Sequence, residues 1–122
     1  MISFKDGGRR PLVGGQIAVD KDGHVVGKGD MRAQMEQVGK NIRACLTAAG
    51  ANVSDIVSTR AYVTDADAFS KNADILTRYL GPETKAASTA AVSLSTGPDF
   101  LVEIEAVAAL NSPASASASG RP

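Results

Sequence analysis

Two glutamates on one predicted strand are the residues best suited to acid–base chemistry in this sequence. Glu103 and Glu105 alternate with Ile104 and Ala106 in the segment LVEIEAVAAL, and side chains two positions apart on a strand point to the same face. Two neighbouring carboxylates can divide into a proton donor and a proton acceptor if burial raises one pKa. The spacing alone, however, is more typical of carboxylates that face solvent or pair with Arg or Lys across a sheet.

The other reactive residue types offer less. His24 is the sole histidine and stands in a loop rich in Gly, Asp and Lys, so no Ser-His-Asp set can be assembled around it. One histidine and one cysteine, Cys45, at no ligand spacing predict no metal site. The glycines match neither the P-loop nor the dinucleotide fingerprint. We therefore expect no metal and no nucleotide cofactor.

Composition limits the partners and the compartment. The chain has 122 residues, a formal net charge of zero, no Trp and only 3 Phe and 2 Tyr. A neutral chain with few aromatic residues lacks the phosphate attraction and the stacking surface of nucleic-acid binders. No apolar run approaches the length of a membrane span, and the start, MISFKDGGRR, has no secretory signal. With a single cysteine, a soluble cytoplasmic protein of one domain is expected.

The elements that position these residues are predicted from caps, periodicity and turn residues. Asp30 is suited to cap a helix over 31–49, whose apolar residues recur at helical spacing and which Gly50 ends. A second helix is expected over 65–80, where Gly81 and Pro82 stop it. Alternating, β-branched or small apolar segments predict strands. These strands cover 2–5, 11–20, 56–64, 86–95 and 100–110.

This order, β-β-α-β-α-β-β, predicts an α+β fold of two layers, a mixed sheet with both helices on one face. The last strand carries small apolar residues on both faces, Ala106 and Ala108 on one side and Val107 and Ala109 on the other. The second face of the sheet is therefore expected to be covered by another copy of the chain. Residues 1–110 form the predicted domain, and the Ser/Ala/Pro/Gly-rich segment 111–122 is expected to be a disordered tail.

Two further features leave alternatives open. Gly14 and Gly15 fall inside the second predicted strand, which indicates either a β-bulge or the close approach of a ligand or another backbone. Arg60 and Tyr62 share one face of the strand 56–64. Arg60 is either an ordinary solvated cation or an interfacial charge that needs a partner.

Taken together, three segments resemble the RidA/YjgF (L-PSP) family over about residues 2–110. They are GGQIAVD, the stretch GDMRAQMEQVGKNIRACLTAAGANVSDIVSTRAYVTDADAF, and the terminal LVEIEAVAAL. The resemblance implies a chorismate-mutase-like fold and a homotrimer, with the sheets around a central barrel and sites in the clefts between subunits. It also implies hydrolysis of reactive enamines and imines to a ketoacid and ammonia, with no metal or organic cofactor.

Position by position, the resemblance assigns the water-orienting glutamate to Glu103 and the pocket-lining strand to Gly14 and Gly15, with Gly14 where a serine is usual. The family's P-A-R-S stretch falls on residues 85–88. Its arginine, which binds the substrate carboxylate as a bidentate fork, is replaced by Ala87.

Neighbouring positions differ from the family pattern as well. Ser88 matches the serine of that stretch, whereas Thr89 stands where cysteine or alanine is often found. The asparagine of the second helix aligns near Ala73, with Asn72 one residue away, and the usual N-terminal tyrosine segment has no counterpart. The chain thus resembles a branch that lacks the substrate-binding arginine.

Three functions stand as alternatives, and the third is an activity often attached to the name of the family that the chain resembles. The first is a cofactor-free deaminase-type hydrolase whose substrate is an enamine or imine other than an ordinary 2-imino acid. The second is a non-catalytic trimer that binds a small metabolite or a protein partner. The third, endoribonuclease activity, is least favoured, because a neutral chain lacks phosphate contacts. As a separate hypothesis, Arg60 would supply the missing cation if it reaches the cleft.

Overall fold

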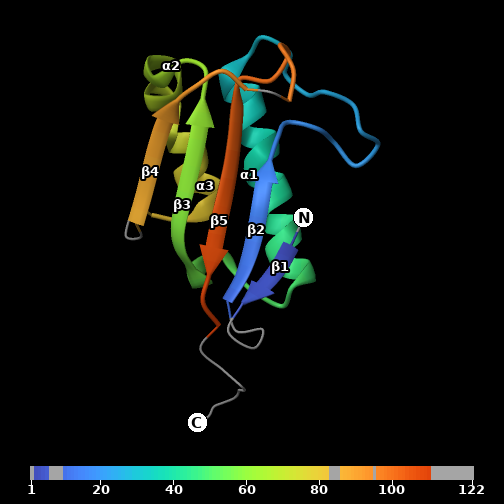
Figure 1. The fold of residues 1–122 in the computed structure, drawn as a ribbon, viewed down its shortest axis with the longest axis vertical. Helices are drawn as coiled ribbons and strands as arrows, with labels where there is room; N and C mark the ends of the chain where they lie inside the picture. Colours follow the sequence, from blue (N-terminus) through green and yellow to red (C-terminus); the bar gives the residue numbers. More distant parts are fainter. Residues whose placement is uncertain (1, 6–9, 83–85, 95, 111–122) are drawn as a thin grey trace.

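The computed structural model describes residues 2–5, 10–82, 86–94 and 96–110. Five strands form one sheet in the order β1-β2-β5-β3-β4. Only β3 and β4 run parallel, while the other neighbours are antiparallel, so the sheet is mixed. All helices lie on one face of it (Figure 1). The predicted α+β architecture is confirmed. The strands are β1 (Ile2–Lys5), β2 (Arg10–Gln16), β3 (Ile56–Val63), β4 (Ala86–Ala91) and β5 (Val102–Ala108).

The long helix α1 (Met31–Ala48) begins and buries its residues as its sequence predicts. The Asp30 side chain caps it by accepting a hydrogen bond from the Ala33 backbone N–H at 3.1 Å. Its apolar stripe packs on the sheet, and Cys45 is half-buried at the edge of that stripe. Within the described residues, no helix is long and apolar enough to cross a membrane. The fully or nearly buried apolar residues of this stripe are Met31, Met35, Val38, Ile42 and Leu46.

The predicted second helix is interrupted. It consists of α2 (Ala66–Lys71) and α3 (Ala73–Leu80), with Asn72 between them at φ −112° and ψ 15°. The Asn72 amide group donates to the Ala68 carbonyl at 2.8 Å. This side-chain bond competes with the backbone bonding that would continue the helix.

Both faces of the sheet can be read from β5. Its residues alternate between buried and half-buried along the whole strand. Val102, Ile104 and Ala106 lie against the helices, while Glu103 and Glu105 lie on the opposite face, which no element among the described residues covers. The predicted covering of that face by another copy, and the homotrimer, stay predictions.

Several predicted boundaries differ from the observed ones. The strand predicted over 11–20 ends at Gln16, because the following residues form a separate turn closed by a bridge between Val19 and Val25. The strand predicted over 86–95 ends at Ala91. The predicted tail 111–122 lies outside the described residues.

Gly14 and Gly15 form a β-bulge. The pairing of β2 with β5 shifts between Val13 and Gln16, so two residues of β2 have no direct partner on β5. This is the first of the two interpretations left open by the sequence. The Gln16 side-chain amide also donates to the Gly14 carbonyl at 3.1 Å.

Candidate functional site

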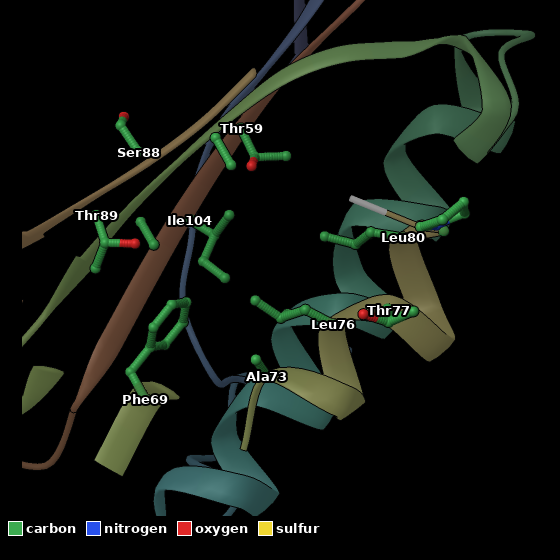
Figure 2. Close-up of a pocket in the computed structure, with 13 residues that line it drawn as sticks. Thr59, Phe69, Ala73, Leu76, Thr77, Leu80, Ser88, Thr89 and Ile104 are labelled. Atoms are coloured by element: carbon green, nitrogen blue, oxygen red, sulfur yellow. The ribbon is translucent and has the colours of Figure 1, made fainter. Parts of the chain in front are cut away.

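A cavity of about 80 Å³ lies between strands β3 and β4 and helices α2 and α3. Figure 2 shows its walls, with the residues of β3 and β4 and Phe69 of α2 on one side and the residues of α3 on the other. None of the thirteen residues that line it carries a charge. Its apolar wall consists mainly of Ala61, Phe69, Leu76, Leu80 and Ile104.

The small residues of β4 leave room for this cavity. Ala87 pairs with Thr59 of β3, and Thr59 pairs in turn with the buried Ala106 of β5. Side chains of paired residues point to the same face of a sheet, so Ala87 and, two positions later, Thr89 face the helices. Because Ala87 ends at its Cβ, no long side chain from β4 enters the space in front of α3.

Three hydroxyl groups face this cavity from different elements. Thr59 lies on β3, Thr89 on β4 and Thr77 on α3, and Figure 2 shows their oxygens on the cavity side. Ser88 also borders the cavity, but its hydroxyl points away (Figure 2). The site therefore combines apolar walls with threonine hydroxyls, each of which can both donate and accept a hydrogen bond.

The structure decides between the two positions near the predicted asparagine of the second helix. Ala73 lines the cavity (Figure 2), whereas Asn72 lies in a separate surface groove with Asp30 and Asp65. The oxygen of the Asn72 side chain accepts a hydrogen bond from Arg32 at 3.3 Å. An amide is thus absent from the wall, and a methyl group takes its place.

Glu103 does not line the cavity. It pairs with Tyr62 on β3, which places its side chain on the open face of the sheet, opposite Ala87. There its carboxyl group lies against Gly15 of β2, so closely that a Cβ atom on Gly15 would be 2.8 Å from the carboxyl carbon of Glu103. The bulge at Gly14 and Gly15 thus provides the space that the Glu103 side chain occupies.

Arg60 lies next to Glu105 rather than in the cavity. The two residues are paired across β3 and β5, and the Tyr62 hydroxyl donates to a Glu105 carboxylate oxygen at 3.1 Å. The Tyr62 hydroxyl, followed by the charge of Glu105, raises the pKa of Arg60 above its ordinary value. Arg60 is exposed. Its neighbourhood is a hollow of about 370 Å³ on the open face, lined by residues that include Leu12, Ser58, Ser88 and Val107.

The loop after β2 brings together a group that the sequence analysis does not anticipate. One carboxylate oxygen each from Asp20 and Asp22 and one imidazole nitrogen of His24 lie within 4.8 Å of one another, a spacing at which they could hold a metal ion. Asp20 Oδ1 accepts hydrogen bonds from the backbone N–H groups of Asp22 and His24, both at 2.9 Å. These bonds, that to His24 foremost, lower the pKa of Asp20. The same hydrogen bonds explain why the three side chains lie together, because they stabilise a turn around Asp20.

Comparison with known proteins identifies the family. The profile described as Endoribonuclease L-PSP matches residues 6–110. The chain belongs to the RidA/YjgF family. A RutC family protein of Pyrococcus horikoshii is 39% identical over 98 residues, which cover 80% of this chain and 76% of that protein. Protein DfrA of Myxococcus xanthus is 34% identical over 104 residues, which cover 84% of this chain and 78% of that protein.

Solved structures agree with this assignment. A Rid-family protein of Yersinia pestis, described as of unknown function, superposes with a TM-score of 0.74 at 36% identity. The superposition covers 84% of this chain and 79% of the Yersinia pestis protein. A putative endoribonuclease of Thermotoga maritima gives a TM-score of 0.77 at 30% identity, with 88% of this chain and 83% of that chain covered.

Of the site residues predicted from the sequence, the cavity brings together Ala87, Ser88 and Thr89, while Glu103, Arg60 and the two glycines lie elsewhere. Sequence reasoning missed Thr59 and Thr77 on the other walls. Alternation along β3 assigns Thr59 to the face opposite Arg60, and that signal was available. No local pattern marks Thr77, because the packing of α3 against β4 decides its place.

Proposed function

We propose that this member of the RidA/YjgF family is a cofactor-free hydrolase of enamine- or imine-type metabolites other than ordinary 2-imino acids. The cavity between β4 and α3 is the substrate site, with Ala87 where the family has its substrate-binding arginine. The single observation that carries the proposal is that none of the described residues lining this cavity is charged. Without an arginine a substrate carboxylate loses its charge-assisted, bidentate hydrogen bonds, so a 2-imino acid would bind weakly here.

The proposal requires more than one copy of the chain. Glu103 and Ala87 lie on opposite faces of one sheet, so a single chain cannot present both to one substrate. A homotrimer removes this difficulty if the open face of one subunit meets the β4 edge of the next. The half-buried Leu12, Tyr62 and Val107 on that face support such contact.

The proposed chemistry uses one carboxylate and one water molecule. Glu103 accepts a proton from the water as its oxygen adds to the imine carbon. The same group then returns that proton to the nitrogen, which gives a carbinolamine with one hydroxyl and one amino group. Glu103 next takes the hydroxyl proton and passes it to the amino group, so that the carbon–nitrogen bond breaks and ammonia and a carbonyl compound leave. An enamine substrate first takes a proton at carbon and loses one from nitrogen to become the imine. No redox partner is needed, because water supplies all the atoms that are added.

The test compares matched substrates on the wild-type chain and on Glu103→Gln. The imine of 2-oxobutyramide is neutral, whereas 2-iminobutyrate of the same shape carries a carboxylate. We expect ammonia release above the uncatalysed rate from the neutral imine, little from 2-iminobutyrate, and loss of the accelerated rate in Glu103→Gln. Efficient turnover of 2-iminobutyrate by the wild-type chain contradicts the proposal.

The separation of Glu103 from the cavity also favours a second candidate, a non-catalytic protein that binds a small metabolite in the same cavity. This protein would bind the neutral compound equally well with and without the Glu103 carboxylate and would accelerate no hydrolysis. Binding and turnover measured on the same two proteins therefore distinguish the two functions.

A further inference from the structure

The residues that line the cavity between β4 and α3 indicate which kind of ligand it can hold. Its strand wall is built from Thr59, Ala87 and Thr89, and its helix wall from Ala73, Leu76 and Thr77. The volume of about 80 Å³ corresponds to about six water-sized groups. A ligand with a short, branched hydrocarbon body fits this space.

A charged ligand would bind weakly between these walls. The described residues around the cavity include no Lys, Arg or His. An ionised group that enters an uncharged site loses its hydration without gaining a counter-charge. Within one chain Arg60 does not supply this charge, because it lies on the opposite face of the sheet with Tyr62 and Glu105.

Hydrogen bonding, by contrast, is available from three directions. Among the described residues, the hydroxyls of Thr59, Thr77 and Thr89 have no protein hydrogen-bond partner, and Figure 2 shows all three oxygens on the cavity side. A neutral group that both donates and accepts, such as a carboxamide or a hydroxyl, matches hydroxyls that also do both.

From these observations we propose that the cavity selects a small neutral ligand, with a branched aliphatic body and one carboxamide-like or hydroxyl group, and discriminates against the matching carboxylate. The inference rests on the proposed function, since it concerns the same cavity, but it is a statement about binding and requires no catalysis. The threonine hydroxyls form hydrogen bonds with the polar end of the ligand, and Ala73 and Leu76 contact its hydrocarbon end.

The experiment uses isobutyramide and isobutyrate, which share size and shape and differ in charge. Both are titrated into the isotope-labelled full chain, and binding is followed by NMR at the backbone amides of Thr77 and Thr89. We expect isobutyramide to bind at least about tenfold more tightly than isobutyrate. Equal or tighter binding of isobutyrate overturns the proposal, as does perturbation centred on Arg60 and Glu105 instead.

Two charge variants on one strand provide the matched comparison. Ala87→Arg places a cation in the cavity, whereas Ala90→Arg, paired with Tyr62 of β3, places the same cation on the other face of β4. We expect Ala87→Arg to improve isobutyrate binding about tenfold or more, and Ala90→Arg to leave the ratio of the two affinities unchanged. If both variants improve isobutyrate binding equally, the effect is general surface charge and the proposal is wrong.

A third variant covers the case in which Ala87→Arg does not fold. Ala87→Leu fills the same space without charge and should weaken isobutyramide and isobutyrate in parallel. If isobutyramide binding survives Ala87→Leu unchanged, the ligand is not in this cavity. The affinities are also measured in Glu103→Gln. A preference for isobutyramide that is preserved in Glu103→Gln, together with no turnover of any imine by the wild-type chain, supports the binding inference while it contradicts the hydrolase.

Discussion

The carboxyl group of Glu103 occupies the space that a side chain at Gly15 would fill. The bulge of β2 brings the two residues together, because the shift in pairing between Val13 and Gln16 sets Gly15 against Glu103 on β5. Gly15 thus acts as a positioning residue for the proposed water-orienting carboxylate.

Gly15→Ala tests this relationship. The added methyl group collides with the flexible end of the Glu103 side chain, which can swing away, so we expect the unfolding free energy to change by less than about 1 kcal/mol. Turnover of the neutral imine should fall toward that of Glu103→Gln, with KM little changed. In the Glu103→Gln background, Gly15→Ala should cause no further loss of turnover. A further loss there would show that Gly15 acts independently of the carboxylate.

Gly39→Ala tests the packing that holds α3, and with it Thr77, in place. A Cβ atom on Gly39 of α1 would lie 2.7 Å from the Cβ of Tyr79 on α3, and neither backbone can yield without separating the helices. We expect a loss of about 1–3 kcal/mol in unfolding free energy from overpacking, measured by urea denaturation. Lys40→Ala, on the exposed face of the same helix, is the control and should change stability little. A stabilised Gly39→Ala would indicate that helix propensity outweighs the contact.

Gln34 is a fully buried polar side chain that ties two loops to α1. Its amide donates to the carbonyls of Gly27 and Asp99 at 3.0 and 2.8 Å, and its oxygen accepts from the Leu101 N–H at 2.8 Å. Gln34→Leu leaves these groups without a partner, and we expect a loss of about 2–4 kcal/mol in unfolding free energy. Gln37→Leu, which removes a single bond to Asn41, should cost less. If the two variants are equally stable, the three bonds of Gln34 contribute nothing net.

The ion pair between Arg32 and Asp74 joins the N-terminal turns of α1 and α3 and makes stability depend on pH. Arg32 donates to both carboxylate oxygens, at 2.9 and 2.7 Å, and this lowers the pKa of Asp74 below 3.8. Because the pKa of Asp74 is lower in the folded state than in the unfolded state, the ion pair contributes its full stabilisation above the unfolded-state pKa. This stabilisation is lost as the pH falls through the folded-state pKa. We therefore expect Asp74→Asn to be less stable than wild type near neutral pH, and the difference to shrink below about pH 3.8.

The control for this prediction is the same substitution in the Arg32→Gln background, where the partner of Asp74 is missing. There Asp74→Asn should give a stability difference that varies less with pH over the same range. A difference for Asp74→Asn that stays constant through the acid range would show that the ion pair is not the source.

Local pattern alone was enough for much of this protein. The cap at Asp30 and the helical spacing of apolar residues predicted α1 because both depend on neighbours within one or two turns. Alternation in LVEIEAVAAL placed Glu103 and Glu105 on one face, since the strand period is two. The two-glycine interruption in β2 indicated either a bulge or the close approach of a ligand or another backbone, and the structure contains the bulge, with the Glu103 side chain against Gly15.

The tertiary structure decided what these residues meet. The segment around Ala87 was expected to form a site with Glu103 in a cleft between subunits. Within one chain β3 lies between β4 and β5, and pairing across it puts the two residues on opposite faces. The interruption at Asn72 turned Ala73, rather than the amide, toward the cavity. Sequence determined which residues lie on a face, because that depends on backbone period. Only the fold determined which faces oppose each other, because strand order and helix packing join residues that are distant in the chain.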